Sequence, residues 1–316
     1  MEMMQLGKTP LKVSRIALGC MRLSENKADA MASIKAALDA GINLFDHADI
    51  YGRGARETMF ANIWDEVPGL RSRIILQSKC GIRSAGSPEP SSPHRYDFSY
   101  EHIVRSVEGS LSRLKTDYLD VLLLHRPDVL MEPAEVARAF DELRRAGKVR
   151  YFGVSNHTSH QMAVLQQALD QPLVANQLLL GLLHSELFEQ GVRLSSRPVM
   201  RNVRGDGTLE HCWLNGVTIQ AWSPLSSGAV TGNLPASAEP HVVQTAEVVA
   251  ELAAARGVSK EAIALGWLLR HPAGILPIIG TMNPARIRAS CEATEVQMSR
   301  EEWYRLFIAS RGEDIP

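Results

Sequence analysis

Short apolar segments recur along the chain, and a longer segment with helical periodicity follows each of them. The apolar segments span residues 16–19, 42–45, 74–77, 119–124, 149–154, 173–176, 217–221 and 275–278. Short strands that are apolar on both faces and separated by helices are typical of a buried parallel sheet. The hydrophobic pattern therefore predicts an α/β fold with eight parallel strands.

The segments between these strands carry apolar residues at helical spacing. Four stripes are clear: Met31, Ile34 and Leu38; Ile103, Val107, Leu111 and Leu114; Val136, Phe140 and Leu143; Met162, Leu165 and Leu169. Gly41 and Gly147 are placed to end two of the helices, and Ser99 is placed to cap the start of another. Asn283 followed by Pro284 predicts the N-cap and first position of a later helix.

Strict alternation of strands and helices favours a (β/α)8 TIM barrel. A chain of 316 residues suits one barrel of about 250 residues with insertions, although length alone also suits two domains of about 150 residues. The competing doubly wound sheet usually has a glycine-rich turn after its first strand, whereas this strand ends Gly19-Cys20-Met21-Arg22. We expect one domain over 1–316, with an N-terminal β-hairpin within 4–13.

Composition narrows the class of partner. The net charge of −1 gives no electrostatic reason to expect binding to nucleic acid or to an anionic membrane. No apolar run approaches the length of about 18 residues that would span a bilayer, and the N-terminus lacks a secretory signal pattern. The four cysteines form no CxxC pair, which is typical of a reduced protein. We expect a cytoplasmic protein with a small-molecule partner; its oligomeric state is open.

Four chemically useful side chains follow consecutive predicted strands. Asp46 and Tyr51 follow the second strand, Lys79 the third and His125 the fourth. Barrel chemistry takes place at the C-terminal ends of strands, so these side chains are expected to meet. The Lys79 ammonium would lower the pKa of Tyr51, Asp46 would hold Lys79, and Tyr51 would act as general acid toward a carbonyl oxygen. His125 would orient the carbonyl or assist proton transfer, and no metal is required.

Each of these residues alone also has an ordinary structural explanation. A strand-end Asp caps or pairs, a strand-end Lys pairs or is solvated, and a lone His or Tyr often only packs. The segment Asp46-His47-Ala48-Asp49 could suggest metal ligands and hence a metal-dependent hydrolase, but no HxH or HExxH motif accompanies it. Gly7-Lys8-Thr9 ends like a phosphate-binding loop, but the required upstream Gly is absent. The set of four therefore favours metal-free carbonyl chemistry.

Five segments resemble the aldo-keto reductase family in order along nearly the whole chain. They are GINLFDHADIYG at 41–52, DYLDVLLLH at 117–125, GKVRYFGVSN at 147–156, AWSPL at 221–225 and IIGTMNPARI at 278–287. The segments at 96–99 and 309–312 resemble a bacterial oxidoreductase subgroup of that family. The resemblance implies a tetrad of Asp46, Tyr51, Lys79 and His125. It also implies hydride transfer from NADPH to an aldehyde or ketone, with Tyr51 as the proton donor.

The resemblance also implies cofactor residues. Ser155, Asn156 and Gln177 would hold the nicotinamide carboxamide, and Trp222 would stack on the ring. Ser223, Leu225, Ser226 and Gly228 would contact the pyrophosphate, in a loop whose backbone N–H groups suit phosphate. Thr281, Asn283 and Arg286 would hold the 2′-phosphate, for which a guanidinium is well shaped. Gly19, Met21, Asp46 and Gly280 complete the expected cofactor set.

One departure concerns cofactor preference. Gly280 stands where many family members carry Lys, so a preference for NADPH over NADH is expected to be weaker. The rival hypothesis is a slow-turnover NADP(H)-binding sensor or regulatory module, as some family members are.

Two loops are expected at the barrel mouth. The loop 191–207 contains Arg193, Arg197, Arg201 and Arg204, which suggests an anionic substrate, contacts with cofactor phosphates, or only a solvated loop. The loop 81–93 is rich in Gly, Ser and Pro and is expected to help close the site. Cys20 and Cys80 are expected to be packing residues. The sequence leaves the physiological carbonyl and the direction of reaction open.

Overall fold

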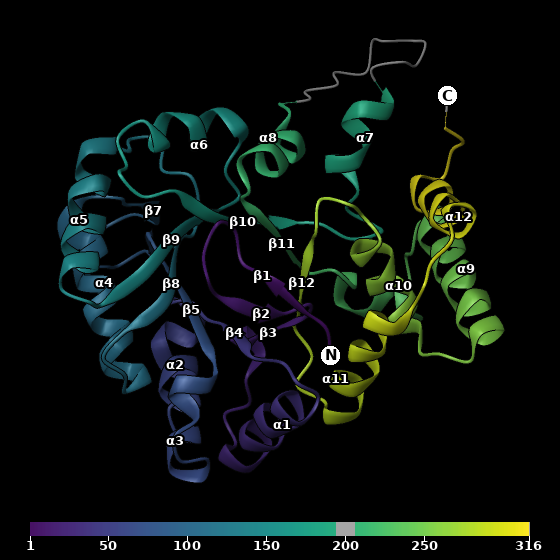
Figure 1. Ribbon diagram of the computed structural model, residues 1–316, viewed down its shortest axis with the longest axis horizontal. Coiled ribbons are helices and arrows are strands. Elements are labelled where there is room, and N and C mark those ends of the chain that lie inside the picture. Colours follow the sequence, from purple (N-terminus) through teal and green to yellow (C-terminus); the bar gives the residue numbers. More distant parts are fainter. Residues whose placement is uncertain (194–205, 316) are drawn as a thin grey trace.

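The computed structural model describes residues 1–193 and 206–315. In this part of the chain, parallel strands close into a barrel of eight, in the order β3-β4-β5-β8-β9-β10-β11-β12 and back to β3 (Figure 1). The strands are β3 (Ala17–Gly19), β4 (Leu44–Asp46), β5 (Ile75–Cys80), β8 (Leu119–Leu124), β9 (Val149–Ser155), β10 (Leu173–Leu179), β11 (Thr218–Trp222) and β12 (Leu276–Ile279). The predicted (β/α)8 barrel is confirmed, and closure of the sheet excludes the doubly wound alternative.

Helices surround the barrel (Figure 1). The α-helices are α1 (Lys27–Asp39), α2 (Ala55–Phe60), α3 (Ile63–Glu66), α4 (Tyr100–Leu114), α5 (Pro133–Arg145), α6 (Ser159–Gln166), α7 (Glu186–Arg193), α8 (Thr208–Asn215), α9 (Pro240–Arg256), α10 (Lys260–Leu269), α11 (Pro284–Cys291) and α12 (Arg300–Arg311). Short 3-10 helices are η1 (Cys20–Arg22), η2 (Tyr51–Gly54), η3 (Leu70–Arg73), η4 (Ser226–Thr231) and η5 (Glu292–Glu295). Among the described helices, none is long and apolar enough to cross a membrane.

The helix ends agree with the sequence in most places. The Asn283 side chain accepts hydrogen bonds from the backbone N–H groups of Ala285 and Arg286, as predicted for an N-cap. Ser99 does occupy the N-cap position of α4, but its side chain makes no capping bond and instead donates to Asp97 Oδ1 at 2.6 Å. The predicted side-chain cap is therefore wrong. Leu169 is also beyond the end of α6, although it is buried.

A hairpin closes the N-terminal end of the barrel. Strands β1 (Met3–Gln5) and β2 (Lys12–Ser14) pair antiparallel, as predicted. Leu6 is fully buried in the core inside the barrel, and the Gly7 N–H donates to Thr218 Oγ1 at 2.7 Å, at the start of β11. Gly7 has a φ of 53°, and a Cβ there would lie 2.6 Å from the carbonyl oxygen of Val174. The hairpin thus sits tightly against the strand starts.

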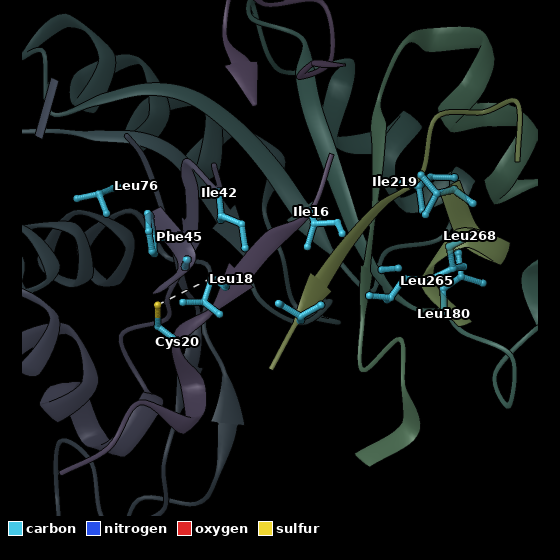
Figure 2. Packing of buried hydrophobic residues seen from close by; sticks show 14 of the residues in the cluster. Ile16, Leu18, Cys20, Ile42, Phe45, Leu76, Leu180, Ile219, Leu265 and Leu268 are labelled. Carbon is cyan, nitrogen blue, oxygen red and sulfur yellow. Dashed lines mark hydrogen bonds between the residues drawn. The ribbon is translucent and has the colours of Figure 1, made fainter. Parts of the chain in front are cut away.

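Alternation along the strands divides the buried residues into two layers. Leu18, Phe45 and Leu76 point outward into the cluster that packs against the helices, part of which is drawn in Figure 2. Their neighbours Ala17 and Leu44 point into the barrel with Val121 and Leu123. Successive side chains of a strand point to opposite faces. The inward positions of β5 are Ile75, Gln77 and Lys79, so the barrel interior changes from apolar to charged toward the C-terminal strand ends.

Candidate active site

A buried ion pair lies at the C-terminal ends of β4 and β5. Lys79 is fully buried and Asp46 is 3% exposed. Lys79 Nζ lies 2.7 Å from Asp46 Oδ2, and it donates a second hydrogen bond to the carbonyl oxygen of His47 at 2.8 Å. A charge taken out of water is tolerated when it is paired and hydrogen-bonded. The two predicted residues therefore form one unit.

Tyr51 completes this unit from the loop after β4. The Lys79 ammonium donates its third hydrogen bond to the Tyr51 hydroxyl, with an Nζ–O distance of 3.1 Å. Tyr51 begins η2, in which Gly52 and Arg53 have φ values of 57° and 54°. This left-handed turn follows Tyr51 directly. All three ammonium protons are satisfied, which fixes the direction of the ammonium toward the phenol.

Below this unit lies a layer of three buried glutamines. Gln77 and Gln177 each donate from Nε2 to Asp46 Oδ1, at 2.6 and 3.1 Å, and both also donate to Gln220 Oε1. The Asp46 carboxylate thus accepts hydrogen bonds from three side chains. Sequence reasoning missed Gln77 and Gln220. Their signal was a polar residue at an inward position of an otherwise apolar strand.

Burial raises the pKa of Tyr51 above its ordinary value, and the opposing effect of the Lys79 ammonium is smaller. The expectation that Lys79 would leave Tyr51 with a lowered pKa is therefore wrong for the protein alone. The cause is the partial burial of Tyr51, which leaves a phenolate poorly solvated. Burial also lowers the pKa of Lys79, but Asp46 and Tyr51 outweigh it and leave that pKa raised. Tyr51 is a phenol held beside a charged ammonium.

His125 follows β8 and faces Tyr51. Its ring lies edge-on to the Tyr51 ring, with centroids 5.9 Å apart. Burial lowers the pKa of His125 to about 2, helped by the positive charges of Lys79 and Arg126. The imidazole is therefore neutral at physiological pH, and its Nδ1 has no hydrogen-bond partner.

A cavity of about 480 Å³ opens over these side chains at the C-terminal strand ends. Of the predicted site residues, its lining includes Gly19, Met21, Asp46, Tyr51, His125, Ser155, Asn156, Gln177, Trp222, Ser223, Leu225, Gly228, Gly280, Thr281 and Arg286. Lys79, Ser226 and Asn283 do not line it: Lys79 lies behind Asp46 and Tyr51, and Asn283 caps α11. The lining residues that sequence reasoning missed are Arg22, Arg126, Pro224, Ser227, Thr231, Glu261, Ile278, Ile279 and Met282.

The expected carboxamide-binding residues are linked to one another. Ser155 Oγ donates to the carbonyl oxygen of Gln177 at 2.9 Å, and Asn156 Nδ2 donates to Ser155 Oγ at 2.8 Å. Trp222 Nε1 donates to Asn156 Oδ1 at 3.1 Å, which fixes the indole beside the amide. Because Gln177 Nε2 is bonded to Asp46 and Gln220, only its Oε1 remains to accept from a ligand.

The loop after β11 has an unusual backbone. Ser223, Ser226, Ser227 and Gly228 have φ values of 52°, 47°, 57° and 91°. Consecutive left-handed residues of this kind cost conformational energy, and turns of successive N–H groups form concavities that bind anions. The buried Ser226 Oγ has no hydrogen-bond partner. The loop therefore has the form of a phosphate cradle with one polar atom still unsatisfied.

The start of α11, which follows the neighbouring strand β12, also lines the cavity. Arg286 lies in its first turn and is exposed, and its backbone N–H is bound by the Asn283 cap. A Cβ at Gly280 would meet nothing within 4 Å. Packing therefore does not exclude a longer side chain at Gly280, and the absence of a Lys there simply removes one possible phosphate contact.

The remaining predictions have mixed outcomes. Arg197, Arg201 and Arg204 lie outside the described residues, as does the side chain of Arg193, so the three explanations of that loop stay predictions. In the 81–93 loop, Ile82 and Arg83 form β6 (Ile82–Arg83), which pairs with β7 (Arg95–Tyr96); no residue of the loop lines the cavity. Cys20 and Cys80 are buried in the core, in agreement with a packing role. Within the described ranges, no three His, Cys, Asp or Glu side chains could together hold a metal ion.

Comparisons with known proteins agree with this geometry. Residues 15–310 match the model of the aldo/keto reductase family. The chain is 41% identical to the uncharacterized oxidoreductase YcsN of Bacillus subtilis over all of both chains. It is 39% identical to a 6-dehydroglucose reductase of Novosphingobium aromaticivorans, over 99% of this chain and 96% of that one. A crystal structure of the thermostable aldo-keto reductase Tm1743 superposes with a TM-score of 0.76 at 25% identity, covering 98% of this chain and 100% of the other. The chain belongs to the aldo/keto reductase family.

Proposed function

We propose that this aldo/keto reductase is an NADPH-dependent enzyme that reduces an aldehyde or ketone to an alcohol, with Tyr51 as general acid. The observation that carries the proposal is the placement of Lys79 Nζ, which bonds both Asp46 Oδ2 and the hydroxyl of Tyr51, two residues that line the cavity. This arrangement holds a proton donor beside a fixed positive charge, and all three protons of that ammonium are bound by the protein.

Several features fit a nicotinamide cofactor. The Ser223–Gly228 loop, with its left-handed Ser223, Ser227 and Gly228 on the cavity wall, suits the pyrophosphate, and Arg286 suits a 2′-phosphate. Trp222, fixed by Asn156, offers an indole face to the nicotinamide, and Ser155, Asn156 and Gln177 oxygens lie near its carboxamide in this proposal. When bound there, the reduced cofactor supplies the hydride.

The side chains of the protein supply the proton and the electrostatics. Tyr51 donates its hydroxyl proton to the carbonyl oxygen as that oxygen gains negative charge. The Lys79 ammonium stabilises the phenolate that remains, and Asp46 keeps Lys79 oriented. In this proposal the neutral His125 imidazole lies beside the carbonyl oxygen and adds no charge there. The phenolate then regains a proton from solvent, so that one hydride and one proton convert the carbonyl to the alcohol.

The test is NADPH oxidation, followed at the nicotinamide absorbance band. The substrates are aromatic aldehydes, quinones, dicarbonyls and 6-dehydroglucose, which appears in the name of one relative, a 6-dehydroglucose reductase. NADH and the reverse reaction with NADP⁺ and the alcohol products run in parallel. We expect Tyr51→Phe to lower kcat about 10²- to 10⁴-fold, as loss of a general acid does, while NADPH affinity stays within a few-fold.

Two outcomes would contradict the proposal. Equal loss of turnover and NADPH affinity in Tyr51→Phe would give Tyr51 a binding role instead. Tight NADP(H) binding with negligible turnover across the panel would favour the slow-turnover sensor or regulatory module.

A further inference from the structure

Arg126 is a charged residue of the cavity to which neither the tetrad nor the cofactor set assigns a role. It follows His125 directly at the end of β8, is half-buried, and lines the same cavity as Tyr51 and His125. Its guanidinium lies over the Trp222 ring, 5.6 Å from the centroid. Trp222 is bonded to Asn156, which in turn donates to the carbonyl oxygen of His125. Arg126 therefore lies at the catalytic end of the cavity.

This cation has no anionic partner among residues 1–193 and 206–315. The remaining charges of the cavity are accounted for differently: Asp46 is paired with Lys79, and Arg22 donates to Ser227 Oγ at 3.4 Å beside the phosphate cradle. Glu261 lies in the first turn of α10 and is not bonded to Arg126. A half-buried guanidinium that carries five donors and lacks a carboxylate is well suited to receive one from a ligand.

The cofactor phosphates are poor candidates for this role. The proposed phosphate contacts, the Ser223–Gly228 loop and Arg286, follow the paired strands β11 and β12, whereas Arg126 follows His125 at the end of β8, three strands away from β11 in the barrel. The proposed cofactor also places its uncharged or positive ring, and not a phosphate, beside Trp222. A guanidinium at this position raises the energy of a positive ring nearby, and an anion from the substrate would offset that repulsion.

We propose that Arg126 is a specificity-determining residue that selects carbonyl substrates carrying a carboxylate. The carboxylate pairs with the guanidinium while the carbonyl reaches Tyr51. The inference rests on the proposed function, since it names the substrate class of the same site. It rests on a described residue and is independent of the arginines of the 191–207 loop.

The experiment uses the 2-, 3- and 4-carboxybenzaldehydes, each with its methyl ester as a neutral counterpart, so that the distance between carbonyl and carboxylate varies. For each pair, the ratio of kcat/KM of acid to ester is measured in wild type and in Arg126→Met. Comparing this ratio between proteins cancels the intrinsic reactivity of each aldehyde. We expect Arg126→Met to lower it by roughly fivefold or more for at least one isomer, as loss of a charge-assisted hydrogen bond requires.

Matched variants separate charge from packing. Arg126→Lys should retain most of the ratio, because it keeps the positive charge. Arg145→Met removes the same charge from the outer surface, where Arg145 is 81% exposed at its side chain, and should leave the ratio unchanged. A change smaller than fivefold in all three isomers with Arg126→Met overturns the proposal, as does an equal fall for acids and esters.

A binding measurement keeps this test separate from that of the proposed function. The monoamides of phthalic, isophthalic and terephthalic acids keep the carboxylate but replace the aldehyde with an unreactive amide, and the diamides are their neutral counterparts. If the wild-type protein turns over no carbonyl compound, the proposed function fails. The role of Arg126 is then tested by titration calorimetry alone, with these compounds in the presence of NADP⁺. Weaker binding of a monoamide, but not of its diamide, in Arg126→Met supports the proposal; equal binding overturns it.

Discussion

The Lys79 ammonium shows how three contacts can define a reactive group. Its acceptors are Asp46, the His47 carbonyl oxygen and the Tyr51 hydroxyl, and none of its protons is left for water. Because Asp46 is itself held by Gln77 and Gln177, the direction of the ammonium is set by residues of four different strands or loops. A change in the glutamine layer would therefore be transmitted to Tyr51 through Asp46 and Lys79.

In the proposed cofactor site, the Arg286 guanidinium is expected to bind the 2′-phosphate. Arg286→Ala should weaken NADPH binding about tenfold or more, the value of a charge-assisted hydrogen bond, and should change NADH binding by less than about twofold. Arg288 is the matched control, because it is exposed on the same helix and does not line the cavity. Fluorescence titration of both cofactors measures the effect. Equal weakening of NADPH and NADH would show that Arg286 does not distinguish them.

At the scale of elements, the barrel depends on close approach between strands. Gly153 lies in β9, and a Cβ there would stand 2.6 Å from the carbonyl oxygen of Ala175 on β10 and 2.7 Å from Leu123 Cδ2 on β8. The first of these atoms belongs to the backbone and cannot rotate away. The position therefore admits only glycine unless the two strands separate.

Gly153→Ala should lower the free energy of unfolding by about 3 kcal/mol, the cost of overpacking a well-packed core. Gly69→Ala is the control, because its φ is 72° but a Cβ there would meet nothing within 4 Å. It should cost only about 1 kcal/mol for the left-handed conformation. Urea unfolding of both variants measures the difference. A Gly153→Ala variant as stable as Gly69→Ala would mean that β9 and β10 adjust freely.

The sequence predicted the elements well because their signals are local. Each of the eight strands is an apolar run, and the helices show their period within a few turns, so neither depends on distant residues. The Ser99 cap failed because Asp97, two residues earlier, competes for the hydroxyl. Gln77, Gln220 and Arg126 were missed because their importance depends on which residues the closed barrel brings opposite them. The direction of the Tyr51 pKa shift depends on the balance between burial and one ammonium, which only the structure shows.

At the scale of the whole molecule, several buried or half-buried histidines are kept neutral. Burial, as the largest cause, lowers the pKa to about 3 for His47, about 2 for His125 and about 4 for His102 and His157. The unfolded chain would instead protonate these residues near the ordinary value of 6.5. Below that pH the unfolded state binds more protons than the native state. Stability is therefore expected to be highest at neutral pH and to decline as the pH falls through 6.5.

His157 offers the cleanest test of this decline, since it is 2% exposed and its Nδ1 is bonded to the Ser155 carbonyl oxygen at 2.9 Å. From pH 7 to pH 5, one such histidine should lower the free energy of unfolding by about 2 kcal/mol. His157→Gln should reduce the wild-type loss by that amount, as measured by urea unfolding at both pH values. The same substitution at exposed His94 controls for loss of an imidazole. An unchanged loss in His157→Gln would show that His157 is not neutral in the native state at pH 5.

The hairpin of β1 and β2 has a consequence for the supply of protons. Because Leu6 and its neighbours fill the N-terminal end of the barrel, the opening to Tyr51 among residues 1–193 and 206–315 lies at the opposite end. That opening is also the one over which the cavity lies. In the proposed reaction, the departing alcohol and the incoming proton therefore share a single route. Reprotonation of Tyr51 and release of the alcohol therefore take place through the same mouth of the barrel.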